Sequence, residues 1–97
     1  ILFKCSVYPK KNIQELDTIS INKIIKFTKI ILKKAVSLGG SSINDFENSN
    51  KKRGKFQEKF NVYDKTGSNC PNLNCNKLVK KIYISNRSTY YCENCQK

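Results

Sequence analysis

The sequence predicts a small α+β protein, in which a helical part is followed by a β-hairpin tied together by cysteines. Apolar residues recur at three- and four-residue steps over residues 21–38, which is the periodicity of a helix. Two runs rich in strand-forming residues, 78–84 and 88–91, flank a turn at Ser85-Asn86-Arg87. A chain of 97 residues buries too little surface to rely on its core alone, so a covalent or metal staple is expected.

The helical part occupies the first forty residues. Residues 1–7 are typical of the end of a helix, and Pro9 marks a turn. Residues 12–20 form a connector with the capping-type residues Asp17, Thr18 and Ser20. Isoleucine is a mediocre helix former, so the apolar face of residues 21–38 should be buried, and Gly39-Gly40 should end the helix. That face contains Ile21, Ile24, Ile25, Thr28, Ile31, Leu32 and Ala35.

The middle of the chain alternates between turns and short ordered pieces. Residues 41–46 read as a polar turn with two apolar anchors, Ile43 and Phe46. Residues 48–54 contain no apolar side chain and predict an exposed loop. Ordered structure should return at residues 56–63, before a turn at residues 64–67.

The cysteine spacing predicts a zinc site of the hairpin-finger type. A C-x4-C pair and a C-x2-C pair are separated by sixteen residues, about the length of a β-hairpin. Two disulfides are the alternative, but nothing in the sequence indicates a secreted chain. Cys5 is left over and is expected to be an ordinary small buried residue. The ligands of one structural Zn²⁺ would be Cys70, Cys75, Cys92 and Cys95.

The charge is strongly positive. Lysine and arginine number 19 against 7 acidic residues, a formal net charge of +12, which four thiolates and one Zn²⁺ would lower only to +10. A basic domain of this size favours a polyanionic partner, nucleic acid first, although a low-G+C codon bias also inflates lysine. No stretch is long enough to span a bilayer, because lysines interrupt the most apolar segment, residues 21–38.

Four segments occur in a familiar order: 39–46, 54–57, 62–67 and 87–97, the last reading RSTYYCENCQK. Together they resemble the C-terminal part of the formamidopyrimidine-DNA glycosylase family, bacterial repair enzymes for oxidised purines. The resemblance implies a partial helix–two-turn–helix DNA-binding domain with a lesion-capping loop over residues 1–63. It implies a four-cysteine β-hairpin zinc finger over residues 64–97.

The resemblance also implies roles for individual residues. Arg87 stands where the family has its finger arginine, which grips phosphates beside the extruded nucleotide. Asn50-Lys51, Arg53 and the C-x4-C spacing depart from the family pattern, which leaves lesion preference open. Backbone groups that would surround the flipped base belong to Ser41, Ile43, Asn44, Asp45 and Phe46.

The predicted function is therefore DNA binding and lesion recognition within a bifunctional glycosylase and abasic-site lyase. The partner would be double-stranded DNA that contains an oxidised purine or an abasic site, and we expect a monomer in the bacterial cytoplasm. The chain opens Ile1-Leu2 and lacks methionine, which predicts a fragment without the family's catalytic proline and glutamate, inactive alone. The alternatives are the sibling glycosylase for oxidised pyrimidines and a non-enzymatic zinc ribbon that binds nucleic acid.

Overall fold

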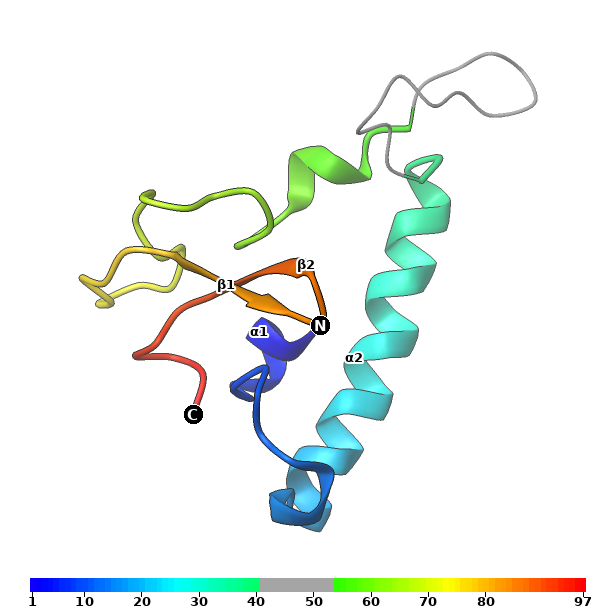
Figure 1. The fold of residues 1–97 in the computed structure, drawn as a ribbon. Coiled ribbons are helices and arrows are strands. Elements are labelled where there is room, and N and C mark those ends of the chain that lie inside the picture. The colour runs from blue at the N-terminus through cyan, green and yellow to red at the C-terminus, as the bar shows by residue number, and fades with distance from the viewer. Residues whose placement is uncertain (41–53) are drawn as a thin grey trace.

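Helices come first along the chain and a single hairpin comes last, as predicted (Figure 1). The structure is a computed structural model, and it describes residues 1–40 and 54–97. These residues confirm an α+β chain. The elements are α1 (Leu2–Cys5), a 3-10 turn (Ile13–Glu15), α2 (Thr18–Ser37), a second 3-10 turn (Phe56–Lys59), β1 (Lys80–Ile84) and β2 (Arg87–Tyr91).

The long helix α2 is one continuous element, and it begins three residues earlier than predicted. The Asp17 side chain accepts a 2.7 Å hydrogen bond from the backbone N–H of Ser20, which satisfies one of the free donors of the first turn. The other end lies where the glycines predict it. Gly39 adopts φ +78°, the left-handed conformation that glycine accepts most easily, and its N–H donates to the Val36 carbonyl.

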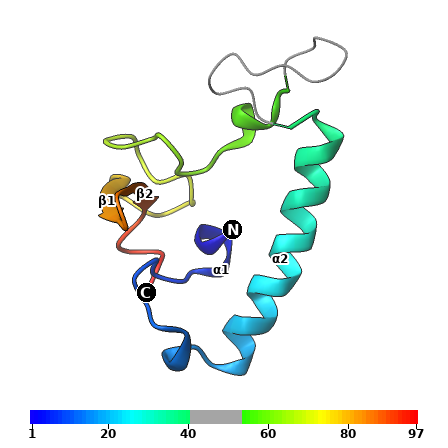
Figure 2. The ribbon, with the colours of Figure 1, turned by 45° about the vertical axis from the view of Figure 1, so that its right-hand side comes forward.

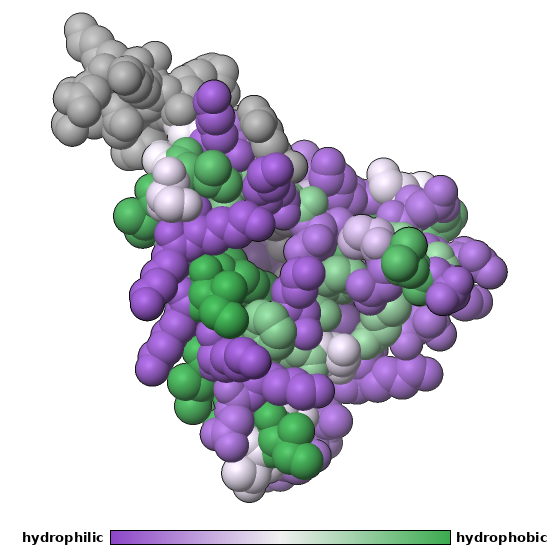
Figure 3. Space-filling model, turned by 180° about the vertical axis from the view of Figure 1, so that it is seen from behind, coloured by the Kyte–Doolittle hydropathy of each residue, from purple (hydrophilic) through white to green (hydrophobic). Residues whose placement is uncertain are grey.

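The predicted burial of the apolar face of α2 is wrong in this structure. No residue of α2 is buried, and Ile21, Ile25 and Leu32 are 39%, 51% and 55% exposed. The physical reason is the size of the partner: α2 packs on α1, and one helical turn cannot cover a helix about 30 Å long. Hydrophobic side chains consequently appear among hydrophilic ones on the surface in Figure 3.

A groove of about 450 Å³ lies between α2 and the segment that follows residue 54. Its apolar lining includes Ile31 of α2, Phe56 and Phe60, and Lys34 and Lys59 stand beside these side chains. Within residues 1–40 and 54–97, no helix combines the length and the apolarity that crossing a bilayer needs.

The hairpin is antiparallel, with Lys80 opposite Tyr91 and Ile84 opposite Arg87. Ser85 and Asn86 both have positive φ, 50° and 64°, as a tight two-residue hairpin turn requires. Arg87 therefore begins β2 instead of lying in the turn. The first strand starts two residues later than predicted, because Leu78 makes only an isolated bridge, to Asn69.

The buried core sits where α1 meets the base of the hairpin. Figure 2 shows α1 between the hairpin and α2. Phe3 of α1 clusters with Cys70 and Cys92, and Val62 packs against this cluster. Cys5 is buried as predicted, at 3% exposure. The first and last thirds of the chain thus share one core, and the hairpin base is packed against the N-terminal helix.

Residues 41–53 lie outside the described part of the chain. The predicted polar turn and nearly all of the predicted loop fall there, and so do Ser41, Ile43, Asn44, Asp45 and Phe46. The chain on either side is joined by two backbone hydrogen bonds. The N–H of Lys55 donates to the Leu38 carbonyl at 2.8 Å, and the N–H of Phe56 donates to the Gly40 carbonyl at 3.0 Å.

Gly54 should be intolerant of any side chain. A Cβ atom there would collide with the carbonyl oxygens of Gly39 and Gly40, which are backbone atoms and cannot rotate away. We predict that Gly54→Ala breaks the two hydrogen bonds at Lys55 and Phe56, which hydrogen exchange at these amides would report as faster exchange.

Gly67→Ala is the matched control. A Cβ at Gly67 meets open space, although φ +82° makes the substitution strained. Its effect should therefore stay local and leave exchange at Lys55 and Phe56 unchanged. Unaltered exchange at both amides in Gly54→Ala would show that the close approach is not required.

Candidate metal centre

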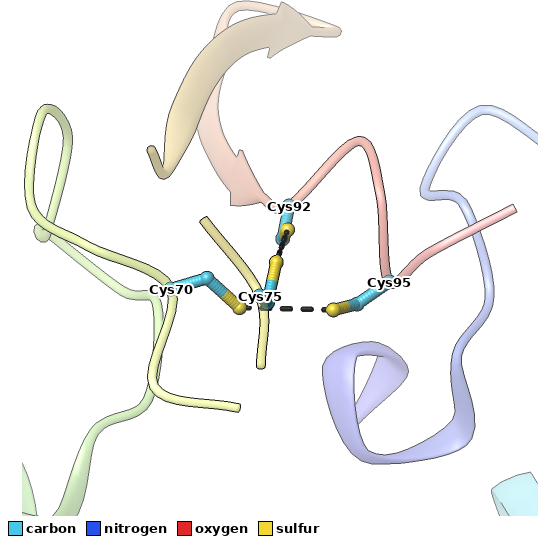
Figure 4. Close-up of side chains that lie close together, drawn as sticks. All are labelled: Cys70, Cys75, Cys92 and Cys95. Carbon is cyan, nitrogen blue, oxygen red and sulfur yellow. Dashed lines mark hydrogen bonds between the residues drawn. The ribbon is translucent and has the colours of Figure 1, made fainter. Parts of the chain in front are cut away.

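The four predicted ligand cysteines meet at the base of the hairpin (Figure 4). Their sulfur atoms all lie within 4.8 Å of one another. The Sγ atoms of Cys70 and Cys95 are 3.7 Å apart, and so are those of Cys75 and Cys92. Each of these contacts joins one cysteine of the first pair to one of the second, so the cluster links the two ends of the hairpin.

These distances fit a tetrahedral metal ion and exclude disulfides. A disulfide holds its sulfurs at about 2.05 Å, and all five cysteines are free. A tetrahedron with metal–sulfur bonds of about 2.3 Å has sulfur–sulfur edges of about 3.8 Å. The two 3.7 Å separations therefore leave room for one ion of that kind at the centre.

The first knuckle, residues 70–75, is wider than a C-x2-C turn. Cys70 is anchored by its own N–H, which donates to the Lys77 carbonyl at 2.9 Å. Asn74 takes a left-handed conformation at φ 65°, which turns the chain back toward Cys75. The two additional residues extend this turn into the solvent, where the Leu73 side chain is 93% exposed.

The second knuckle, residues 92–95, closes the hairpin from the other side. Cys92 is completely buried, and its carbonyl accepts a 2.9 Å hydrogen bond from the Gln96 N–H. The Asn94 amide donates to the sulfur of Cys75 at 3.5 Å, a contact suited to a thiolate. An exposed ion pair between Lys80 and Glu93, at 2.6 Å, joins this knuckle to β1.

The cysteines differ in how readily they lose a proton. Burial raises the pKa of Cys70 to about 12, because a thiolate there would lose its hydration. A hydrogen bond from the backbone of Lys77 lowers the pKa of Cys75 to about 7. A metal ion that binds here must therefore displace the proton of Cys70 against the cost of burial, whereas a pKa of about 7 leaves Cys75 about half ionised near neutral pH.

The hairpin tip presents Arg87 to solvent. Arg87 is exposed, and the Thr89 hydroxyl donates to its carbonyl at 3.5 Å. Sequence patterns single out Arg87 and the four cysteines but indicate no role for Asn94 or Gln96. Asn94 contacts Cys75, 19 residues away, and Gln96 contacts Val7, 89 residues away, so no local pattern indicates these two contacts; only the contact of Gln96 with Cys92 is local.

The fold and the cysteine cluster place the chain in one class of protein: small α+β modules whose β-hairpin is closed at its base by four cysteines that could bind a metal ion. No protein-family model matches the chain. Relatives nevertheless align along its whole length. It is 39% identical over 97 residues to formamidopyrimidine-DNA glycosylase of Listeria innocua, and the alignment covers 100% of this chain and 35% of that enzyme. The enzyme of Mycoplasmopsis pulmonis is 38% identical, with 100% and 34% covered.

The solved structures to which this fold is similar are of the same kind of enzyme as these sequence relatives. The Lactococcus lactis enzyme in complex with DNA that contains an abasic site superposes with a TM-score of 0.87 at 34% identity, over 99% of this chain and 34% of that one. A complex of MutM with DNA containing carbocyclic 8-oxo-G gives a TM-score of 0.83 at 34% identity, over 99% and 32%. The chain is a homologue of one region of the formamidopyrimidine-DNA glycosylases. It spans about a third of the length of the relatives that it matches.

The cysteine cluster predicts one bound ion for each chain. Reduced protein titrated with Zn²⁺ should bind one equivalent, and Cys92→Ser should lose tight binding and unfold the hairpin, because three ligands supply much less of the folding free energy. Cys5→Ala is the matched control, since Cys5 lies outside the cluster. Metal analysis that finds less than about half an equivalent in the parent would contradict the assignment.

Proposed function

We propose that this chain is the DNA-binding and lesion-recognition region of a glycosylase and abasic-site lyase that removes oxidised purines from double-stranded DNA. The observation that carries the proposal is that all 97 residues align with about a third of a formamidopyrimidine-DNA glycosylase, at 39% identity. The four-sulfur cluster at the base of an arginine-tipped hairpin supports it independently. The enzyme would work as a monomer on DNA in the bacterial cytoplasm.

The metal in this proposal is Zn²⁺, and its role is structural. Four thiolates complete a tetrahedral set and leave no open position for water or substrate, which separates structural zinc sites from catalytic ones. Cys70, Cys75, Cys92 and Cys95 would hold the ion. When bound, it neutralises charge among the four thiolates and cross-links the two ends of a hairpin that has little core of its own.

Arg87 is the residue proposed to grip DNA. It lies at the first position of β2, next to a two-residue turn, on a tip too narrow to read a groove. A guanidinium presents two parallel N–H donors to the oxygens of one phosphate, so the contact would be with the backbone and would carry no sequence information. Asn86 and Ser88 stand beside it as further hydrogen-bonding groups.

The segment 41–46 is proposed to read the extruded base through its backbone. The Ser41 carbonyl would accept the additional N7 hydrogen of 8-oxoguanine, and the amides of Ile43, Asn44, Asp45 and Phe46 would surround its O6. An enzyme that acts on a base must take it out of the duplex and hold it outside the stack. Backbone recognition places few demands on the side chains there.

The chemistry itself is proposed to reside outside these 97 residues. Covalent amine catalysis needs a nucleophile with a depressed pKa. Hydrogen bonds to Glu93 and Tyr83 raise the pKa of Lys80 and of Lys81, which is the opposite of what such a nucleophile requires. The family's proline amine and adjacent glutamate have no counterpart in the chain. The chain alone should therefore bind DNA without cleaving it.

DNA binding by the chain should depend strongly on salt. Each phosphate that a cation neutralises releases counterions. A plot of the logarithm of the binding constant against the logarithm of the salt concentration should therefore have a slope of about −0.9 for each phosphate contact. A fluorescence titration with duplex DNA at several salt concentrations measures this slope. Equal affinity at low and high salt, or a clear preference for single-stranded RNA, would sink the proposal.

Replacing Arg87 should weaken binding to damaged DNA without disturbing the fold. Arg87→Ala should keep one zinc per chain and lose about 1–3 kcal/mol of binding to a duplex that contains an abasic site, the range for hydrogen bonds to a charged group. Arg87→Lys should recover only part of that, because an ammonium cannot fork across two oxygens.

A charge-matched control separates the arginine's geometry from its charge. Lys29→Ala also removes one positive charge, from the exposed surface of α2, and should change affinity little beyond the general salt effect. If Arg87→Ala binds as tightly as the parent, the tip does not contact DNA.

A further inference from the structure

One polar side chain is buried at the junction of the hairpin and the helical part. Gln96 is 3% exposed and uses both ends of its amide. Its Oε1 accepts a 3.0 Å hydrogen bond from the N–H of Cys92, and its Nε2 donates at 2.9 Å to the carbonyl of Val7. The side chain therefore bridges the second cysteine knuckle and a segment 89 residues earlier.

Further contacts surround this bridge and form what we name the terminal joint, residues 6–8 with 91, 92, 96 and 97. The N–H of Lys97 donates to the Ser6 carbonyl at 3.1 Å, and the N–H of Tyr8 donates to the Lys97 carbonyl at 3.3 Å. The rings of Tyr8 and Tyr91 lie 5.3 Å apart, centre to centre. The joint thus attaches the last residue of β2 and the knuckle behind it to the end of α1.

The metal site cannot make this attachment by itself. All four ligands come from residues 70–95, so an ion among them fixes the hairpin internally. None comes from residues 1–63, against which the whole hairpin must be held. The Gln96 bridge, the ring contact and the packing of Phe3 on Cys70 and Cys92 supply that second constraint.

The orientation of the hairpin matters because its tip is far from the joint. A strand of five residues is about 16 Å long, so a tilt of about 10° at its base moves the tip by about 3 Å. A displacement of that size exceeds the tolerance of a hydrogen bond. A forked contact from Arg87 to a phosphate therefore requires the hairpin base to be held firmly.

We propose that Gln96 is a positioning residue for Arg87: its buried amide fixes the direction of the finger relative to the helical part. This inference rests on the proposed function, since it assumes that Arg87 grips a phosphate. Gln96 would contact no DNA and no metal. It would act by satisfying two buried backbone groups that belong to different parts of the chain, and these can both be paired only in one orientation of the hairpin.

Gln96→Met tests the bridge in the zinc-loaded chain. Methionine has a similar length but offers neither group, so the N–H of Cys92 and the carbonyl of Val7 lose their side-chain partner. We expect one zinc per chain and a roughly 3- to 10-fold weaker affinity for a duplex with a tetrahydrofuran abasic-site analogue, as when Arg87 loses one of its hydrogen bonds to phosphate. In the Arg87→Ala background the same change should weaken binding by less than about twofold, because no contact between the tip and a phosphate remains to be oriented.

A second pair of variants tests the joint from its other side, away from the cysteines. Tyr8→Leu removes the ring contact with Tyr91 and should likewise weaken binding only when Arg87 is present. Tyr8→Phe keeps the ring and should match the parent. This pair decides the question if Gln96→Met fails to hold zinc.

The outcomes separate the two proposals. If Arg87→Ala weakens binding but Gln96→Met and Tyr8→Leu bind like the parent, Gln96 does not position the finger and the proposed function stands. Equal losses with and without Arg87 would also overturn the inference, since a general loss of structure would act in both backgrounds. If Arg87→Ala itself binds like the parent, the role of the tip fails and this inference fails with it.

Discussion

The convergence of four sulfur atoms is the constraint on which the rest of this structure depends. Residues 70–97 bury few side chains, and the two strands of the hairpin are five residues each. Strands this short do not hold together alone in water. The 3.7 Å contacts between Cys70 and Cys95 and between Cys75 and Cys92 join the segments before and after the hairpin. Everything proposed for the tip follows from this closure at the base.

A second constraint acts between the ends of the chain. Phe3 packs on the cysteine cluster, and Gln96 reaches the carbonyl of Val7. The hairpin is therefore not an independent unit, since it packs against α1, the helix that precedes it by more than seventy residues. Aromatic contacts that run from Phe56 through Phe60 and Tyr63 also reach Tyr90 of β2. A finger that is rigid within itself gains a defined direction only through such contacts.

The sequence predicts some elements more accurately than others, because only some of them depend on interactions between neighbouring residues. The end of α2 was predictable because Gly39-Gly40 acts locally, through the conformations that glycine allows. The periodicity predicts a start three residues too late, because the helix begins at the Asp17 cap, before the periodic pattern sets in. The burial of its isoleucines was predicted wrongly, since periodicity marks a face and cannot show whether a partner covers it. The sequence pattern predicts Arg87 in the turn, but Ser85 and Asn86, both with positive φ, complete the turn before it.

Local sequence patterns are enough to predict which four cysteines cluster and the order of the elements, because cysteine spacing, glycine stops and turn residues act over a few positions. The sequence also carried the family resemblance, through the segments that end in RSTYYCENCQK. Only the tertiary structure decided how these pieces meet. The Gln96 bridge, the closeness of Gly54 to Gly40 and the exposure of α2 depend on residues far apart in the chain. Contacts of that kind leave no local signal, since each partner alone reads as an ordinary glutamine, glycine or isoleucine.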